Sequence, residues 1–149
     1  MSLQPEPLSE IPAETARIAR AAFRKGNVIM RLRDEFGTLY ADADLAHLFP
    51  KRGQPAWSPW RLALITVFQF LEQLSDRDAA DAVRARLDWK YALGLELDNP
   101  GFDHTVLSEF RTRLVAGQAE LLLLDTMLAR FKEHGLLKTG NAPRMASRT

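Results

Sequence analysis

The sequence contains no cysteine, so disulfide bridges and thiolate metal sites are excluded. It also lacks an uncharged apolar stretch of the roughly 20 residues that a membrane-spanning helix needs. The N-terminal segment MSLQPEPLSE has neither the basic part nor the apolar part of a secretory signal. These absences together predict a cytoplasmic protein that does not bind a membrane.

A strong net charge is missing too, since 20 basic and 19 acidic side chains leave only +1 at neutral pH. The charges are nevertheless grouped along the chain. Residues 17–33 contain six basic side chains and no acid, whereas residues 34–50 contain four acids and no arginine or lysine. We interpret these blocks as solvated faces of helices, which is the commonest role of such charge runs.

The segment SPWRLALITVFQFLEQL, residues 58–74, is the most apolar part of the chain. Ser58 and Pro59 are typical of a helix start, because serine can accept a bond from a free N–H and proline has no N–H to satisfy. Large apolar side chains lie around most of this helix, so we expect the rest of the chain to surround it. They are Trp60, Leu62, Leu64, Ile65, Val67, Phe68, Phe70, Leu71 and Leu74.

Elsewhere apolar residues also recur at helical spacing, and no alternation with a period of two persists. The 149 residues therefore predict a single all-α domain in which about five to seven helices pack around the helix at about Pro59–Leu74. We expect an irregular lead-in at 1–12, the helical domain at 13–137 and a flexible tail at 138–149. The other helices are predicted at 13–25, 28–39, 76–87, 88–93, 104–117 and 118–134, with a short apolar patch at 45–49.

Several helix ends and buried faces follow from individual residues. Ser75 is followed three residues later by Asp78, a variant of the capping box, and Asp103 is expected to cap the helix after it. Gly94 is expected to end a helix. The predicted inward residues are Val28, Leu32, Phe36 and Leu39 in the second helix and Leu121, Leu122, Leu124, Leu128 and Phe131 in the last.

The helix after Asp103 has two distinct faces. Its apolar residues, Val106, Leu107, Phe110 and Leu114, recur at helical spacing and are expected to point inward. The opposite face carries short polar groups near the helix start, as does the second helix of a helix-turn-helix, which enters the major groove of DNA. An ordinary solvated helix face is the alternative interpretation. The candidate DNA-reading residues are His104, Thr105, Ser108, Arg111 and Thr112.

Basic residues elsewhere are candidates for contacts with DNA phosphates. Such contacts supply most of the affinity for a duplex, because each neutralised phosphate releases a counterion. For each of them a solvated surface position is the alternative. They are Arg84, Arg86 and Lys90 around the predicted helices 76–87 and 88–93, and Lys51 and Arg52 in the loop before residue 58.

The sequence gives little support for a metal site, for nucleophilic catalysis or for a phosphate-binding loop. Asp76 and Asp78 lie at a helix start, where carboxylates favour the positive end of the helix dipole, so we do not assign them to a metal site together with Asp81. The three histidines are scattered, and no nucleophile elbow or phosphate-cradling loop is present. We interpret the aromatic residues Trp57, Trp60, Trp89 and Tyr91 as core anchors rather than platforms for stacked bases.

Two long segments resemble the N-terminal domain of bacterial insertion-sequence transposases of the InsH type. They are LSDRDAADAVRARLDWKYALGL at residues 74–95 and GFDHTVLSEFRTRL at residues 101–114. The resemblance extends over about residues 11–138 and includes the Gly-Gln-Pro at 53–55. It implies an all-helical, DNA-associated domain that precedes an RNase H-like catalytic domain. In that catalytic domain three acids hold two divalent metals, expected to be Mg²⁺.

The resemblance ends near Lys138. Family members continue there through a basic stretch into a Thr-Asp-Ser segment that carries the first catalytic aspartate, whereas this chain reads TGNAPRMASRT. No catalytic residue can therefore be transferred to this sequence. We expect a truncated or frameshifted gene, no enzymatic activity of this chain alone and no cofactor of its own.

The combined expectation is a nucleoid-associated domain that binds double-stranded DNA at the terminal inverted repeats of a mobile element. The alternative is a protein-protein interaction or dimerisation module, or an inhibitory fragment, whose partner is a second copy or the intact transposase. No small-molecule substrate is expected in either case.

Overall fold

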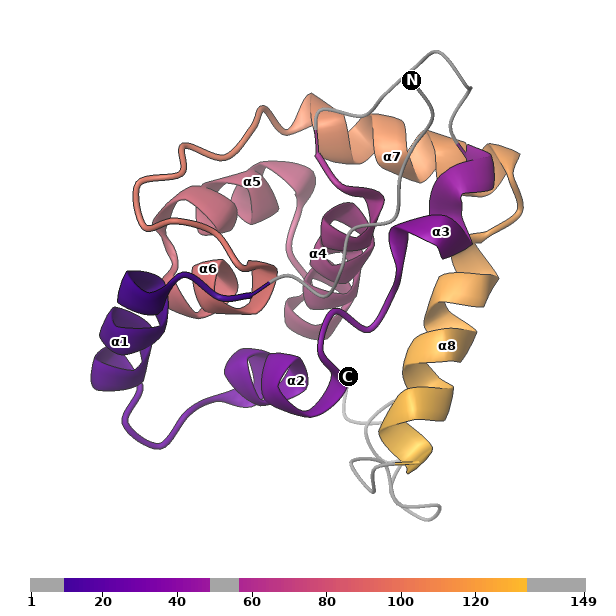
Figure 1. Ribbon diagram of the computed structural model, residues 1–149. Helices are drawn as coiled ribbons and strands as arrows, with labels where there is room; N and C mark the ends of the chain where they lie inside the picture. Colours follow the sequence, from indigo (N-terminus) through magenta and orange to yellow (C-terminus); the bar gives the residue numbers. More distant parts are fainter. Residues whose placement is uncertain (1–9, 49–56, 134–149) are drawn as a thin grey trace.

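The computed structural model describes residues 10–48 and 57–133, and this part of the chain contains eight α-helices, one 3-10 turn and no strand (Figure 1). The all-α prediction is confirmed. There is one helix more than expected, because residues 42–48, which include most of the predicted apolar patch, form a short helix and a 3-10 turn. The elements are α1 (Ala13–Ala22), α2 (Val28–Phe36), α3 (Asp42–Leu45), η1 (Ala46–Leu48), α4 (Pro59–Glu72), α5 (Asp76–Ala85), α6 (Leu87–Leu93), α7 (Thr105–Ala116) and α8 (Glu120–Glu133).

Helix α4 lies in the middle of the fold, with the other long helices around it (Figure 1). Most of its large apolar side chains are buried, as predicted, and Leu71 and Leu74 pack against the same core. Phe70 is the exception, because its side chain is 59% exposed. The prediction that the surrounding chain buries the large apolar side chains of this helix is therefore wrong at Phe70. The buried members are Trp60, Leu62, Leu64, Ile65, Val67 and Phe68.

The start of α4 is capped from a distant part of the chain. Pro59 occupies the first turn as predicted, but the side chain of Ser58 makes no capping hydrogen bond to the helix. Instead the carboxylate of buried Asp42 accepts the backbone N–H of Trp60 at 2.9 Å. This bond satisfies one of the free N–H groups of the helix and joins α3 to α4.

Two arginines from other helices satisfy the carbonyl end of α6. Arg33 of α2 donates to the carbonyl of Ala92 at 2.6 Å, and Arg61 of α4 donates to that of Leu93 at 2.8 Å. Positive charge at this end also complements the helix dipole. Because Arg33 is buried, the interpretation of the basic block 17–33 as a solvated face is wrong at this residue.

Other predicted helix ends agree with the structure, in contrast to Ser58. Ser75 accepts the N–H of Asp78 at 3.1 Å, which confirms the predicted cap of α5. Asp103 accepts the N–H of Thr105 at 3.1 Å, but the residue directly before α7 is His104, so the cap was predicted one residue too early. Gly94, at φ 67°, follows α6 in the left-handed region where glycine is favoured.

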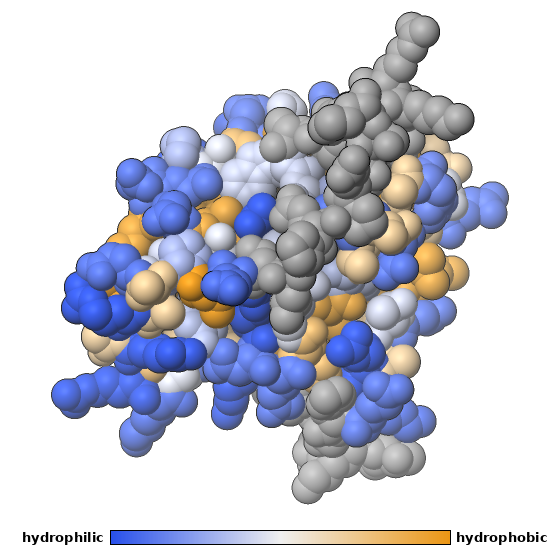
Figure 2. All heavy atoms as spheres, viewed as in Figure 1, coloured by the Kyte–Doolittle hydropathy of each residue, from blue (hydrophilic) through white to orange (hydrophobic). Residues whose placement is uncertain are grey.

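The buried faces of α2 and α8 differ in part from the prediction. Val28 is exposed at the start of α2, and Leu121, Leu122 and Leu128 are exposed on α8, with Leu121 68% accessible. Hydrophobic residues reach the surface at the right of Figure 2, where Figure 1 places α8. The core side of α8 is formed by Leu123, Met127 and Phe131.

Candidate nucleic-acid interface

Helix α7 separates its apolar and polar residues as the sequence predicted. Leu107, Phe110 and Leu114 are buried in the main core, and Val106 packs against it. The four candidate reading residues within the helix are exposed on the other side, and His104 just before it is half-buried. The exposed four are Thr105, Ser108, Arg111 and Thr112.

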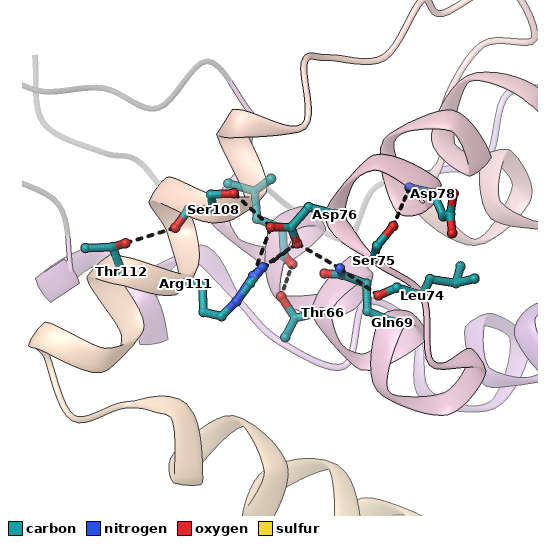
Figure 3. A network of polar contacts seen from close by, with 10 residues as sticks. Thr66, Gln69, Leu74, Ser75, Asp76, Asp78, Ser108, Arg111 and Thr112 are labelled. Atoms are coloured by element: carbon teal, nitrogen blue, oxygen red, sulfur yellow. Dashed lines mark hydrogen bonds and ion pairs between the residues drawn. The ribbon is translucent and has the colours of Figure 1, made fainter.

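Asp76, the first residue of α5, brings two of these residues together (Figure 3). The hydroxyl of Ser108 donates to the Asp76 carboxylate at 2.8 Å, and both terminal nitrogens of Arg111 donate to the same carboxylate. From α4, the amide nitrogen of Gln69 donates to it at 3.0 Å. One carboxylate therefore joins α4, α5 and α7 and fixes the orientation of the α7 surface.

The surroundings of Asp76 favour its charged form. Burial raises the pKa of Asp76, but the hydrogen bonds from Arg111, Gln69 and Ser108 outweigh burial and lower this pKa below its usual value. The carboxylate is thus ionised at neutral pH and offsets the positive charge of Arg111. The α7 surface is consequently less basic than its sequence indicates.

The hydroxyl groups of the candidate readers are engaged within the protein. Thr105 donates its hydroxyl proton to Asp103 at 2.7 Å, and Thr112 donates to the backbone carbonyl of Ser108 at 3.0 Å. The Ser108 proton points to Asp76 in the same way. Because their protons are already donated within the protein, these hydroxyls can act toward a ligand mainly as hydrogen-bond acceptors.

A shallow groove runs along this part of α7. It combines the Asp76–Arg111 ion pair with small or apolar side chains near the end of the helix. Its lining residues are Asp76, Ser108, Arg111, Thr112, Val115 and Ala116.

Of the basic residues predicted to contact phosphates, Arg84 and Arg86 differ in their surroundings. Arg84 is exposed on α5 and pairs with Asp81 at 2.5 Å, one turn away. Arg86 is held between two carboxylates, Glu72 at 2.5 Å and Asp88 at 2.6 Å. Arg84 is therefore accessible to a ligand, whereas Arg86 connects α4 to α6.

Lys90 lies inside the fold, with 2% of its surface exposed. Its ammonium donates to the carbonyl of Asn99 at 2.7 Å, and burial lowers the pKa of Lys90. In this position the ammonium group binds the segment after α6 and is not exposed for a contact with a DNA phosphate. Lys51 and Arg52 lie outside the described residues, and their phosphate contacts stay a prediction.

The helix-turn-helix arrangement also stays a prediction. Helices α6 and α7 are joined by residues 94–104, a connection longer than the roughly 3–4-residue turn of that motif. Short connections occur at 73–75 between α4 and α5, at Arg86 between α5 and α6, and at 117–119 between α7 and α8.

The sequence did not reveal Asp76 and Gln69 as parts of this surface. Sequence reasoning gives Asp76 only the role of a carboxylate that favours a helix start, and its place in the Leu-Ser-Asp-Arg junction of the resemblance is the one available signal. Within residues 10–48 and 57–133, no group of three histidine or acidic side chains is arranged to hold a metal ion. None of the helices in these ranges is long and apolar enough to cross a bilayer.

Comparison with known proteins identifies the family. Neither the curated proteins nor the solved structures gave a significant match. A family model described as "Transposase domain (DUF772)" matches residues 19–113, from within α1 to the last turn of α7. The match covers more than half of the chain and includes Asp76, Ser108 and Arg111. The chain therefore belongs to the transposase domain family DUF772.

Proposed function

We propose that this chain is the DNA-binding domain of a transposase and recognises the terminal inverted repeats of its mobile element. The observation that carries this proposal is the family match, which includes the accessible polar surface of α7. The proposal assigns no catalytic residue and no cofactor to the chain. Strand cleavage would then require the metal-binding catalytic domain of a transposase.

In the proposed mode of binding, α7 lies in the major groove and its exposed face meets base edges. Arg111 and His104 are the groups best suited to specify bases, since the hydroxyls of Thr105, Ser108 and Thr112 already donate within the protein. Arg84 is placed to contact the phosphate backbone, which positions the protein without reading sequence.

The test is a fluorescence-anisotropy titration of the full chain against duplexes that carry the inverted repeats flanking the gene. A duplex of the same composition in scrambled order is the control, and each titration is done at two salt concentrations. We expect tighter binding to the repeat than to the control, and an affinity that falls as salt rises. Equal affinity for the two duplexes would contradict sequence recognition.

A second candidate function is association with another copy of the chain, or with the intact transposase as its inhibitor. Three leucines on α8, Leu121, Leu122 and Leu128, favour it because they are exposed on a helix beyond the family match. Size-exclusion chromatography with light scattering, with and without repeat DNA, discriminates between the functions. A dimer that is insensitive to salt and indifferent to DNA favours association.

A further inference from the structure

One edge of the Arg111 guanidinium is left open by its ion pair. Nη1 donates to Asp76 at 3.0 Å and Nη2 also donates to it, so the end of the guanidinium faces the carboxylate. The guanidinium is planar with N–H groups in fixed directions, so Nε–H and the second Nη2 hydrogen lie along the adjacent edge. Among the described residues no acceptor contacts Nε, and the Arg111 side chain is 47% exposed.

Asp76 is itself held firmly. Its side chain is only 20% exposed, and it accepts hydrogen bonds from Gln69 and Ser108 in addition to Arg111. It also stands at the first position of α5, where the helix dipole favours a carboxylate. The ion pair therefore restrains Arg111 before any ligand arrives, which reduces the side-chain entropy lost on binding.

The negative charge of Asp76 in the ion pair determines which hydrogen-bond acceptors Arg111 can bind well. A phosphate approaching Arg111 would also meet the negative charge of Asp76, so the net attraction would be weak. A neutral group with two acceptors side by side gains both hydrogen bonds without this repulsion. In the major groove, guanine presents such a pair in its O6 and N7 atoms.

We propose that Arg111 reads a guanine through its Nε–Nη2 edge, and that Asp76 is the positioning residue that presents this edge. This inference rests on the proposed DNA-binding function and adds the base that the surface recognises. The expected site contains a G·C pair at which Arg111 makes a bidentate contact.

The first experiment uses the full chain and a duplex library with a randomised core, from which bound sequences are selected. Each guanine of the selected duplex is then replaced, one at a time, by 7-deazaguanine, which lacks the N7 acceptor but keeps base pairing. We expect one position at which this replacement weakens binding by about 5- to 10-fold, the effect of one lost hydrogen bond. Because the protein is unchanged, protein folding cannot influence the result.

The second experiment repeats the titration with Arg111→Lys, which keeps the charge but not the planar fork. At the sensitive position, this variant should bind the normal and the modified duplex equally. Asp76→Asn should reduce discrimination at the same position but raise affinity for a scrambled duplex, because Arg111 regains its uncompensated charge. A merely structural role of Asp76 would lower both affinities together.

The possible failures are distinguishable. If the chain selects and binds no duplex, the proposed function itself is wrong. If it binds a selected duplex but no guanine distinguishes the parent from Arg111→Lys, only the guanine contact is refuted. If Asp76→Asn tightens binding to both duplexes with discrimination intact, Asp76 opposes binding and does not position Arg111.

Discussion

Arg86 connects parts of the fold that are separated in the sequence. Its guanidinium pairs with Glu72 at the end of α4 and with Asp88 in α6, and it lies 5.4 Å from the ring centroid of Trp89. The carboxylate of Asp88 is buried, and besides Arg86 it accepts hydrogen bonds from the amide of Asn27 and from the backbone N–H of Trp89, both at 2.9 Å. Removal of Arg86 would leave the buried carboxylate of Asp88 without its positively charged partner.

We therefore predict that Arg86→Ala lowers the free energy of unfolding by about 2 kcal/mol, a moderate value because the arginine itself is partly exposed. Arg84→Ala is the matched control, since its pair with Asp81 lies on the surface and should contribute less than about 0.5 kcal/mol. Denaturant unfolding followed by circular dichroism measures both. Equal losses in the two variants would contradict the structural role of Arg86.

The ion pair of Asp76 predicts a dependence of stability on pH. Because the folded-state pKa of Asp76 lies below its unfolded value, its contribution is fully present above the unfolded pKa of about 3.9 and is lost as pH falls through the folded pKa. Asp76→Asn should lower the melting temperature at pH 7, and the difference from the parent should shrink below about pH 4. A difference that stays constant down to pH 2 would argue against this linkage.

For single residues, the sequence predicted which side chains are exposed better than it predicted which residues they contact. The i, i+4 pattern of Phe110 and Leu114 placed Ser108 and Arg111 on the outer face, because helix geometry is local. Their common partner Asp76 lies 32 and 35 residues earlier, and only the packing of α5 against α7 brings it there. The burial of Lys90 was missed for the same reason.

Helix α8 shows where helical periodicity becomes ambiguous. The run of leucines at 121–124 places an apolar side chain on every side of the helix, so the spacing alone does not select the face that packs. The structure selects Leu123, Met127 and Phe131, and the Phe131 ring lies 5.2 Å from that of Phe36 in α2. Helix α4 presented no such ambiguity, because nearly all of its circumference is buried.

Because Leu123 is buried and its neighbour Leu122 is exposed, the two leucines allow a matched pair of substitutions on α8. Leu123→Ala should lower the free energy of unfolding by about 2–5 kcal/mol, because it creates a cavity in the core. Leu122→Ala, at a side chain that is half exposed, should change it by less than about 0.5 kcal/mol. Urea unfolding of both variants measures the difference. A larger loss for Leu122→Ala would show that α8 packs in another register.

At the scale of the whole molecule, two groups of exposed cations among the described residues can be compared, although Arg113 and Lys132 are exposed elsewhere. Arg24, Lys25 and Arg31 are exposed around the turn from α1 to α2, at the lower left of Figure 1, whereas Arg77 and Arg84 are exposed on α5, beside α7. With a net charge of only +1, the protein has little long-range attraction for DNA, so the affinity depends on which local group of cations meets the phosphates. The sequence showed the basic block at 17–33 most clearly, but folding places it away from α7.

The two groups allow a charge-matched test of where the duplex binds. If α7 lies in the major groove, Arg77→Ala combined with Arg84→Ala removes two cations beside it, and the slope of log K against log salt should become shallower by up to about 1.8, or 0.9 for each phosphate contact. Arg24→Ala combined with Lys25→Ala removes the same charge at the far end and should leave that slope nearly unchanged. Anisotropy titrations across a range of salt concentrations measure both slopes. If the second pair changes the slope and the first does not, the duplex binds along α1 and α2, and the α7 surface has another role.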